Sequence, residues 1–172
     1  MARADNIHPA ALPLESLLAQ CEVRRLRRSG PGGQHRNKVE TAVVLRHFPT
    51  DVKAEANERR SQIENKAVAL FRLRVNLALE VRGKIDKREL PSLLWQSRLK
   101  SGRIEVSQSH GDFPALLAEA LDVISACSAD VKAAAESLQS TASQLIKFLK
   151  QEPRALQLVN EWREAKNLHR LK

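Results

Sequence analysis

The residues that could do chemistry lie in one short segment, Arg28 to Lys38, which reads Arg-Ser-Gly-Pro-Gly-Gly-Gln-His-Arg-Asn-Lys. Three glycines and a proline surround the neutral amide of Gln34, a composition that lets a backbone enter a confined site with little side-chain bulk. Glutamine has no pKa near neutrality, so Gln34 cannot act as a general base, and no Ser-His-Asp or Cys-His arrangement is apparent in the segment. Catalysis by these residues must therefore work by positioning.

A phosphate-binding loop is the first alternative for a segment so rich in glycine. The nucleoside-triphosphate pattern requires Lys and then Ser or Thr after its last glycine, whereas Gln34 follows Gly33 in this chain. The glycine spacing of dinucleotide-binding loops is not met either. Nucleotide binding is therefore not expected here.

The segment resembles the Gly-Gly-Gln domain that is shared by class I peptide chain release factors and the codon-independent ribosome-rescue hydrolases. The resemblance runs from about Arg24 to about Leu79. It rests on five stretches: Arg-x-Ser-Gly-x-Gly-Gly-Gln-His-x-Asn-Lys ending at Lys38, Ala42-Val43, Phe48-Pro49-Thr50, Glu58-Arg59-Arg60-Ser61-Gln62 and Asn65-Lys66-Ala67. So many fixed residues in order exclude an ordinary surface loop.

The resemblance implies a ribosome-dependent peptidyl-tRNA hydrolase whose catalytic residues are Gly32, Gly33 and Gln34. In that family the backbone N–H of the glutamine stabilises the charge that develops at the ester, and its side chain shapes a pocket that admits water. The partners implied are the large ribosomal subunit, its 23S-type ribosomal RNA and peptidyl-tRNA. Eight residues around the tripeptide are expected to contact RNA: Arg24, Arg25, Arg27, Arg28, His35, Arg36, Asn37 and Lys38.

The formal charge of +9 on 172 residues indicates a polyanionic partner. Residues 1–111 hold 21 Lys/Arg against 12 Asp/Glu, whereas residues 112–172 hold eight of each. The whole excess therefore lies in the part of the chain that contains the glycine segment, which favours nucleic acid over a merely soluble basic surface. Aromatic residues make up only 3% of the chain, which disfavours a sheet that stacks bases.

Hydrophobic patterns predict the elements that must position the segment. Before residue 60 we expect one short helix and two strands: Leu14–Gln20, Glu22–Arg28 and Glu40–Phe48. Residues 52–56 could form a returning antiparallel strand or begin a helix. The capping box that starts at Ser61 predicts a long helix up to Gly83, with an apolar face that includes Ile63, Ala67 and Leu70.

The fold class expected is α+β: a short mixed sheet packed by a long helix, followed by a small all-helical unit. Residues 1–83 would form the hydrolase domain, 84–111 a connector and 112–172 the helical unit. In the connector we expect a short helix over 91–99 and an extended piece at 104–106. Four helices are expected after it: Pro114–Ala126, Asp130–Leu138, Thr141–Lys150 and Pro153–Leu168.

Residues 134–146 have the spacing of a helix-turn-helix, with Thr141 at the cap of the second helix. Gln139 stands where a turn glycine is usual, and the second helix carries only Lys147 and Lys150. We therefore favour a plain packing motif over an RNA-binding one.

Reading stop codons requires a further domain with its own recognition tripeptide, and neither is visible in this sequence. The resemblance therefore implies codon-independent release in ribosome rescue. The neutral helical end differs from the basic tail of the bacterial rescue hydrolases, which leaves two placements: split large subunits that still hold peptidyl-tRNA, or docking of the helical unit on RNA or a protein partner. The alternative function is a non-catalytic module that binds RNA or DNA through the basic domain and the helix-turn-helix.

Nothing in the sequence indicates a membrane, a metal or a cofactor. No stretch approaches the roughly 18 apolar residues of a membrane helix. Asp5 and Glu15, with no apolar signal core near them, favour the cytoplasm over an exported or organellar address. Cys21 and Cys127 match neither a disulfide framework nor a metal-ligand spacing.

Overall fold

Strand β2 (Ala42–His47) is the centre of a three-stranded sheet in which β1 (Cys21–Leu26) and β3 (Lys53–Ala56) lie on either side. The computed structural model describes residues 7–26 and 41–172. Both strand pairs are antiparallel, so the prediction of a mixed sheet is wrong. Only residues 48–52 separate β2 from β3, and that connection is too short for the crossover that parallel strands need. Of the two alternatives for residues 52–56, the returning antiparallel strand is the one observed, as β3.

Alternation along β2 decides which face of the sheet is buried. Val43 and Leu45 are buried on the face that packs against the long helix, as their β-branched and apolar side chains predict. Ala54 and Ala56 of β3 lie on the same face, because Leu45 pairs with Ala54 and Val43 with Ala56. Small side chains on β3 let the helix approach the sheet closely.

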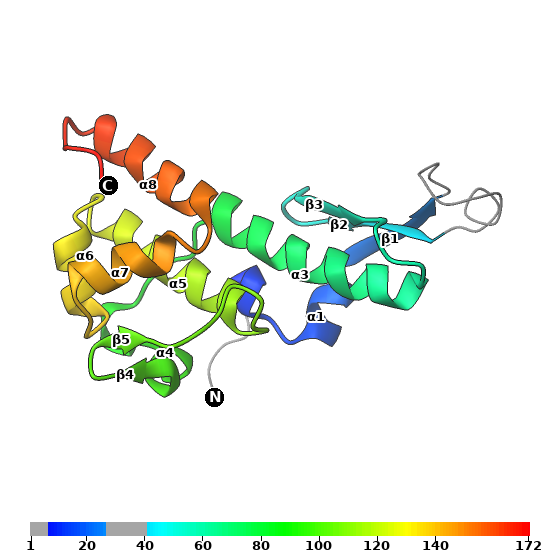
Figure 1. Ribbon diagram of the computed structural model, residues 1–172, viewed down its shortest axis with the longest axis horizontal. Helices are drawn as coiled ribbons and strands as arrows, with labels where there is room; N and C mark the ends of the chain where they lie inside the picture. Colours follow the sequence, from blue (N-terminus) through cyan, green and yellow to red (C-terminus); the bar gives the residue numbers. More distant parts are fainter. Residues whose placement is uncertain (1–6, 27–40) are drawn as a thin grey trace.

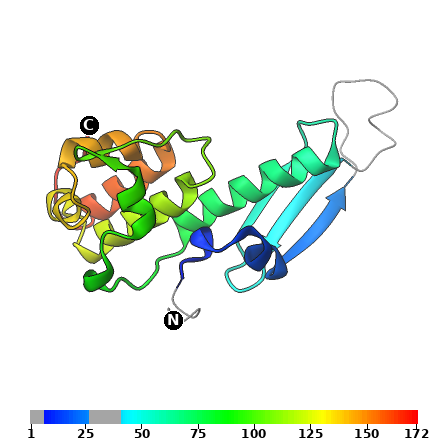
Figure 2. The ribbon, with the colours of Figure 1, turned by 90° about the horizontal axis from the view of Figure 1, so that it is seen from below.

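Helix α3 (Gln62–Glu80) begins after its N-cap Ser61, whose hydroxyl oxygen accepts a hydrogen bond of 3.5 Å from the Glu64 backbone N–H, one of the two bonds of the predicted capping box. Figure 2 shows the sheet lying along one side of this helix. Two residues of its predicted apolar face, Ile63 and Ala67, are exposed instead, Ile63 to 82%. They lie in the first turns, where Asn65 is the residue turned into the core.

The other end of α3 runs into a group of helices, so that the sheet and the helical part lie at opposite ends of an elongated molecule (Figure 1). The helical part contains α5 (Phe113–Ala126), α6 (Val131–Ser137), α7 (Ala142–Leu149) and α8 (Pro153–Glu164), which confirms the four predicted helices. Leu73 and Leu77 of α3 share one buried cluster with Leu116 and Leu117 of α5. The hydrophobic core is therefore continuous along the molecule.

Around this framework lie the shorter elements: η2 (Pro9–Ala11), α1 (Leu14–Ala19), η3 (Lys87–Glu89), α4 (Leu93–Arg98), β4 (Leu99–Lys100) and β5 (Arg103–Ile104). Helices α1 and α4 confirm the short helices predicted for their segments. The extended piece expected at 104–106 overlaps β5 only at Ile104, and β5 pairs antiparallel with β4 in a hairpin whose turn is Ser101 and Gly102. Each strand has two residues, which is too short to produce a periodic pattern in sequence.

A polar group joins the end of α3 to the helical part. Arg82 donates a hydrogen bond of 2.9 Å to the carboxylate of Asp122 in α5, and its guanidinium lies 5.6 Å from the ring centre of Trp162 in α8. The ring of His8 donates from Nε2 to the carbonyl of Val81 at 3.1 Å. These contacts bring the N-terminal segment, α3, α5 and α8 together at one place.

Helix α8 ends at Glu164 rather than at the predicted Leu168. Asn167 adopts a left-handed backbone with φ of 57°, and the Leu168 N–H returns to the carbonyl of Arg163 at 2.9 Å, which closes the helix. None of the helices in the described part of the chain is long and apolar enough to cross a membrane.

Candidate functional site

The segment with the predicted catalytic residues leaves the sheet where β1 ends and β2 begins, and Leu26 pairs with Ala42 at that point. Figure 1 shows this end of the sheet beside the start of α3 and away from the helical part. Nine predicted site residues lie outside the described residues, and their roles stay predictions: Gly32, Gly33, Gln34, Arg27, Arg28, His35, Arg36, Asn37 and Lys38. What the structure describes is the loop base, by which we mean the ends of β1 and β2, the turn at 57–61 and the first turn of α3.

Asn65 ties the loop base together. Its side chain is completely buried, and its amide nitrogen donates to the backbone carbonyls of Thr41 at 2.7 Å and of Arg59 at 2.9 Å. The amide oxygen accepts from the backbone N–H of Arg59 at 2.9 Å. Because a buried polar group is costly when it lacks a partner, these bonds fix where β2 starts relative to α3.

An ion pair holds the turn at 57–61 from the opposite side. Two guanidinium nitrogens of Arg72 donate to the Glu58 carboxylate, at 2.5 and 3.2 Å, and one of them also donates to the carbonyl of Glu55 at 2.8 Å. Burial acts to raise the pKa of Glu58, yet backbone N–H donors and Arg72 outweigh it and hold the pKa below its ordinary value. Arg72 therefore fastens the turn to the middle of α3.

Arg24 and Arg25 are the two predicted RNA-contacting residues that the structure describes, and it places them on opposite faces of the sheet. Arg24 pairs with Val44 and Arg25 with Val43, and neighbouring residues of a strand point to opposite sides. Arg24 donates to Glu22 on its own strand at 2.7 Å, in an exposed ion pair of small energy.

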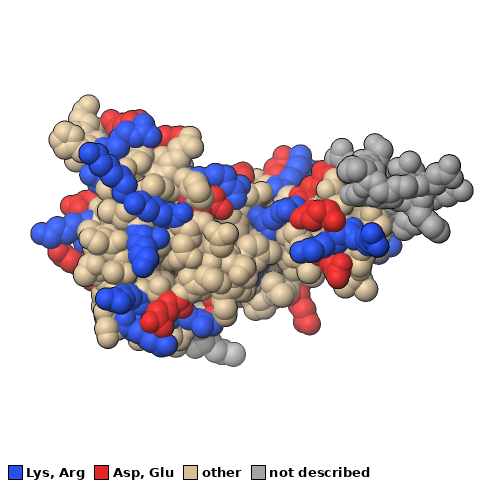
Figure 3. Space-filling view, in the orientation of Figure 1, with Lys and Arg blue, Asp and Glu red and all other residues tan. Residues whose placement is uncertain are grey.

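A second basic group, not among the predicted site residues, lies at the start of α3. Arg59, Arg60 and Lys66 are exposed, and none of them forms an ion pair with a carboxylate of the described residues. We call these three residues the α3 basic cluster. Ile63 is exposed among them, so this end of the molecule offers cations and one apolar side chain. Figure 3 shows Lys and Arg side chains at both ends of the face it presents and a mostly uncharged middle.

The sequence motif Asn65-Lys66-Ala67 was one of the stretches on which the resemblance rests, but no role for Asn65 followed from it. The signal that could have found it is an asparagine in the first turn of a helix, followed by the apolar spacing of a buried face. Its partner Thr41 is 24 residues away, so the contact itself has no pattern in sequence.

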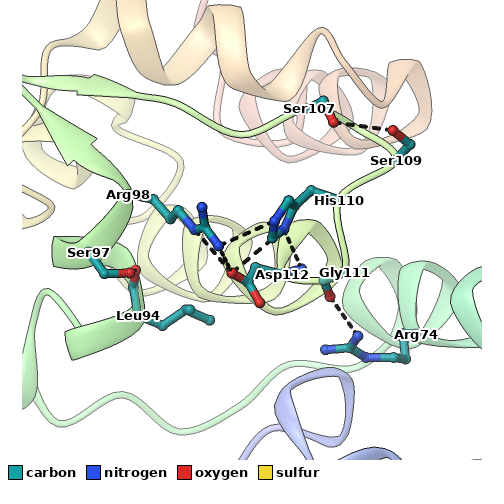
Figure 4. A network of polar contacts seen from close by, with 9 residues as sticks. All are labelled: Arg74, Leu94, Ser97, Arg98, Ser107, Ser109, His110, Gly111 and Asp112. Atoms are coloured by element: carbon teal, nitrogen blue, oxygen red, sulfur yellow. Dashed lines mark hydrogen bonds and ion pairs between the residues drawn. The ribbon is translucent and has the colours of Figure 1, made fainter.

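The other group of chemistry-bearing side chains lies before α5, where His110 and Asp112 face Arg98 of α4 (Figure 4). Arg98 donates to the Asp112 carboxylate at 2.5 Å and lies 3.3 Å from Nε2 of His110. Ser107 and Ser109 bond to each other, at 3.2 Å. The contacts of Arg98 with Asp112 and His110 fasten the segment before α5 to α4, and among the described residues no hydroxyl hydrogen-bonds His110.

His47 is also structural, because its ring nitrogens bond to Thr50 at 2.7 Å and Gln20 at 3.0 Å and burial lowers its pKa. Among the described residues, no three His, Cys, Asp or Glu side chains are grouped so that they could hold a metal ion. The described chemistry at the loop base is therefore backbone positioning and positive charge.

Comparison with known proteins finds a match to the model of a family described as the RF-1 domain, over residues 17–110. The chain is 34% identical to "Peptide chain release factor 1, mitochondrial" of Bos taurus over 99 residues, which are 56% of this chain and 22% of that relative. It is 53% identical to "Peptide chain release factor PrfB1, chloroplastic" of Arabidopsis thaliana over 51 residues, 30% of this chain and 11% of that relative. The chain thus spans less than a quarter of the length of either curated relative.

Proposed function

Because the chain belongs to the RF-1 domain family, we propose that it hydrolyses the ester of peptidyl-tRNA in the peptidyl transferase centre of the large ribosomal subunit. The observation that carries the proposal is the extent of the match. It covers residues 17–110 and so includes Gly32, Gly33 and Gln34 together with the strands and helix of the loop base. Two relatives named as peptide chain release factors support it.

In the proposed reaction a water molecule attacks the ester carbonyl carbon, the bond to the ribose oxygen of the tRNA breaks, and that oxygen leaves with a proton. The backbone N–H of Gln34 would donate to the oxyanion, a contribution of roughly 3 kcal/mol where bulk water is excluded. Gly32 and Gly33 would let the backbone approach the ester without a Cβ in the way. Ribosomal RNA and the tRNA would share the catalysis.

Such a mechanism depends on delivering one amide to within hydrogen-bonding distance of a bond on another molecule. The loop base supports this proposal, because Asn65 and Arg72 hold both the start of β2 and the turn at 57–61 on one rigid helix. The exposed arginines of β1 and the α3 basic cluster would neutralise ribosomal RNA phosphates around the site.

We propose further that release does not depend on a codon. The support is the fold of the residues beyond the family match, which form helices packed on α3 in one continuous core. Two relatives are named as mitochondrial and chloroplastic, so the cytoplasmic address stays a prediction. The split large subunit as target and a protein partner for the helical unit also stay predictions.

The test is peptide release from purified ribosomal complexes that carry labelled peptidyl-tRNA. We expect Gln34→Ala to lower the release rate by about 100-fold or more while ribosome binding stays within about twofold. The matched control is Gln157→Ala, which changes an exposed glutamine of α8 far from the loop base. Unchanged release by the Gln34 variant would refute the proposal.

Codon dependence is tested with three substrates: intact stalled ribosomes, ribosomes with a stop codon in the decoding site, and isolated large subunits. Equal rates with and without a stop codon are expected. A rate that rises only with a stop codon would refute codon independence, and a preference for isolated subunits would assign the protein to ribosomes that have already been split.

A further inference from the structure

Helices α6 and α7 contact each other and are joined by a short turn, at the place where the sequence has helix-turn-helix spacing. The turn between them contains Gln139 with φ of 53°, the left-handed conformation for which this position usually has glycine. Thr141 caps α7 through a hydrogen bond of 3.3 Å from the Gln144 N–H to its hydroxyl oxygen. A non-glycine residue in a left-handed conformation is retained only when the surrounding contacts hold it.

Two hydrogen bonds hold this turn. The indole N–H of the buried Trp95 in α4 donates to the carbonyl of Leu138 at 2.9 Å, and the hydroxyl of Ser140 donates to the carbonyl of Gly102 at 2.8 Å. The second bond places the tip of the β4–β5 hairpin beside the start of α7, and α7 also contacts β5. The hairpin and α7 therefore form one rigid surface.

The two segments that build this surface are basic, although acidic residues flank them. Residues 90–104 and 137–151 contain five Lys or Arg and no Asp or Glu, and Glu89, Glu105, Glu136 and Glu152 stand directly before and after them. Two of the five have carboxylate partners, since Arg98 pairs with Asp112 at 2.5 Å and Lys100 with Glu105 at 2.8 Å. The remaining three form no ion pair within the described part of the chain: Arg103, Lys147 and Lys150.

The exposed face of α7 is polar and basic along its length. Ser143, Lys147 and Lys150 are exposed at helical spacing, whereas Leu145 and Phe148 on the other face are buried. We call the exposed residues of α7 and the hairpin the α7–hairpin surface: Lys100, Arg103, Thr141, Ser143, Lys147 and Lys150. Figure 3 shows Lys and Arg side chains over this helical end of the molecule, with Asp and Glu side chains among them.

We propose that the α7–hairpin surface binds the phosphate backbone of double-helical RNA. Lysines, an arginine and two hydroxyl groups are the donors that phosphate oxygens accept from. Trp95 and Phe148 are buried and the surface has no aromatic side chain of its own, which excludes base stacking as the means of binding. RNA rather than DNA is assigned on the basis of the proposed ribosomal function.

Recognition by shape and phosphate follows from the same composition. The major groove of an RNA duplex is too deep and narrow for a helix to read, so contacts run along the backbone and the shallow minor groove. An eight-residue helix is about 12 Å long and can follow only a short stretch of backbone. The surface therefore adds affinity and orientation, and the loop base at the other end of the molecule remains free for a second contact.

The experiment measures binding of the full chain to a labelled RNA hairpin with a stem of about 16 base pairs, between about 50 and 200 mM salt. We expect Lys147→Glu combined with Lys150→Glu to weaken binding about tenfold. The slope of the logarithm of the binding constant against the logarithm of the salt concentration should become shallower by about 1–2, which corresponds to the loss of one to two phosphate contacts. The control combines Lys84→Glu with Lys166→Glu, two exposed lysines outside the surface, and should change the dissociation constant by less than about threefold. Thermal unfolding monitored by circular dichroism verifies that both variants fold.

Equal losses of RNA affinity in the two double variants would mean that binding depends on the net charge alone, and would overturn the proposal. So would tighter binding to a DNA hairpin of the same sequence, which would reassign the surface to DNA. If RNA binding is unchanged while release from ribosomes falls, the surface docks on a protein and the RNA proposal is wrong. The binding assay contains no ribosome and no ester, so its failure leaves the hydrolase proposal standing, and the failure of the hydrolase proposal leaves the binding result standing.

Discussion

The side-chain amide of Asn65 donates a hydrogen bond of 2.7 Å to the backbone carbonyl of Thr41, and so joins the first turn of α3 to the residue that precedes β2. The glycine segment enters the sheet at this residue. The geometry of the proposed active site therefore depends on a buried amide that takes no part in the chemistry.

Asn65→Ala should lower the free energy of unfolding by about 3 kcal/mol, because it leaves a buried N–H and two carbonyls without their partner. Asn76→Ala on the same helix is the matched control. Asn76 is half-buried, and its bonds to Lys53 and Arg154 are exposed, so water can replace them and a loss below about 1 kcal/mol is expected. Urea denaturation measures both values, and similar losses would contradict the role assigned to Asn65.

The same pair of variants separates positioning from stability. At a temperature where both proteins are fully folded, peptide release by Asn65→Ala should be slower than by Asn76→Ala, because only Asn65 fixes the loop base. The measurement is single-turnover release with ribosomes in excess. Equal rates would show that the loop base tolerates the loss of this anchor.

Much of this architecture follows from local patterns. The β-branched alternation of β2 and the cap at Ser61 predict their elements to within a few residues, because both signals are made by neighbours in sequence. Ile63 shows where the pattern fails. Its spacing fits the apolar face of α3, but which turns of a helix meet the sheet is decided by tertiary packing, and the first turn faces solvent.

Long-range polar contacts are the part that sequence does not predict. The bond from Trp95 to Leu138 spans 43 residues and that from Ser140 to Gly102 spans 38, and neither pair has a spacing that any motif encodes. The hairpin that supports α7 was not predicted, because each of its strands has only two residues. The pattern predicted the two helices α6 and α7 but not the contacts that fix the turn between them.

Gly83→Ala should destabilise the joint between α3 and the helical part. A Cβ at this position would lie 2.7 Å from a carboxylate oxygen of Asp122, which is buried and accepts hydrogen bonds from Arg82 and from the backbone of Gly83. Moving Asp122 breaks these bonds, so a loss of about 1–3 kcal/mol is expected. Gly111→Ala is the control, since a Cβ there meets nothing within 4 Å. Equal melting temperatures for the two variants would refute this account.

The same carboxylate predicts a pH dependence. Burial raises the pKa of Asp122 from 3.8 to about 6 despite the opposing charge of Arg82. The folded chain therefore binds this proton more tightly than the unfolded chain, and the resulting stabilisation is fully present below pH 3.8 and is lost as the pH rises through about 6. A shift of this size corresponds to about 3 kcal/mol.

Asp122→Asn should remove that dependence. The difference in unfolding free energy between the wild-type chain and the variant should change by about 3 kcal/mol, in the direction that favours the wild type at low pH, between about pH 7 and about pH 4. Glu119 lies near and its pKa is also raised by burial, but it is present in both proteins and cancels. If the difference in unfolding free energy stays constant with pH, Asp122 has the same ionisation in the folded and in the unfolded chain.

Gln139→Gly should stabilise the protein by about 0.5–1 kcal/mol, because glycine adopts the left-handed φ of 53° without the steric penalty that a side chain incurs. Part of the gain is offset by the greater freedom of glycine in the unfolded chain. Gln157→Gly makes the same change inside α8 and should cost about 1 kcal/mol. If both substitutions destabilise the protein, the contacts of the Gln139 side chain stabilise the fold by more than its left-handed backbone conformation costs.

Ile63→Ser tests whether the exposed end of α3 docks on the ribosome. The side chain is 82% exposed, so its removal should change the free energy of unfolding by less than about 0.5 kcal/mol. If the α3 basic cluster lies against RNA or ribosomal protein, the same side chain becomes buried there, and losing about 1.5 kcal/mol of burial should lower release at limiting ribosome concentration by roughly tenfold. Leu93→Ser, at an 83% exposed position of α4, is the matched control and should leave release unchanged. An effect of Ile63→Ser no larger than that of Leu93→Ser would contradict docking of the exposed end of α3.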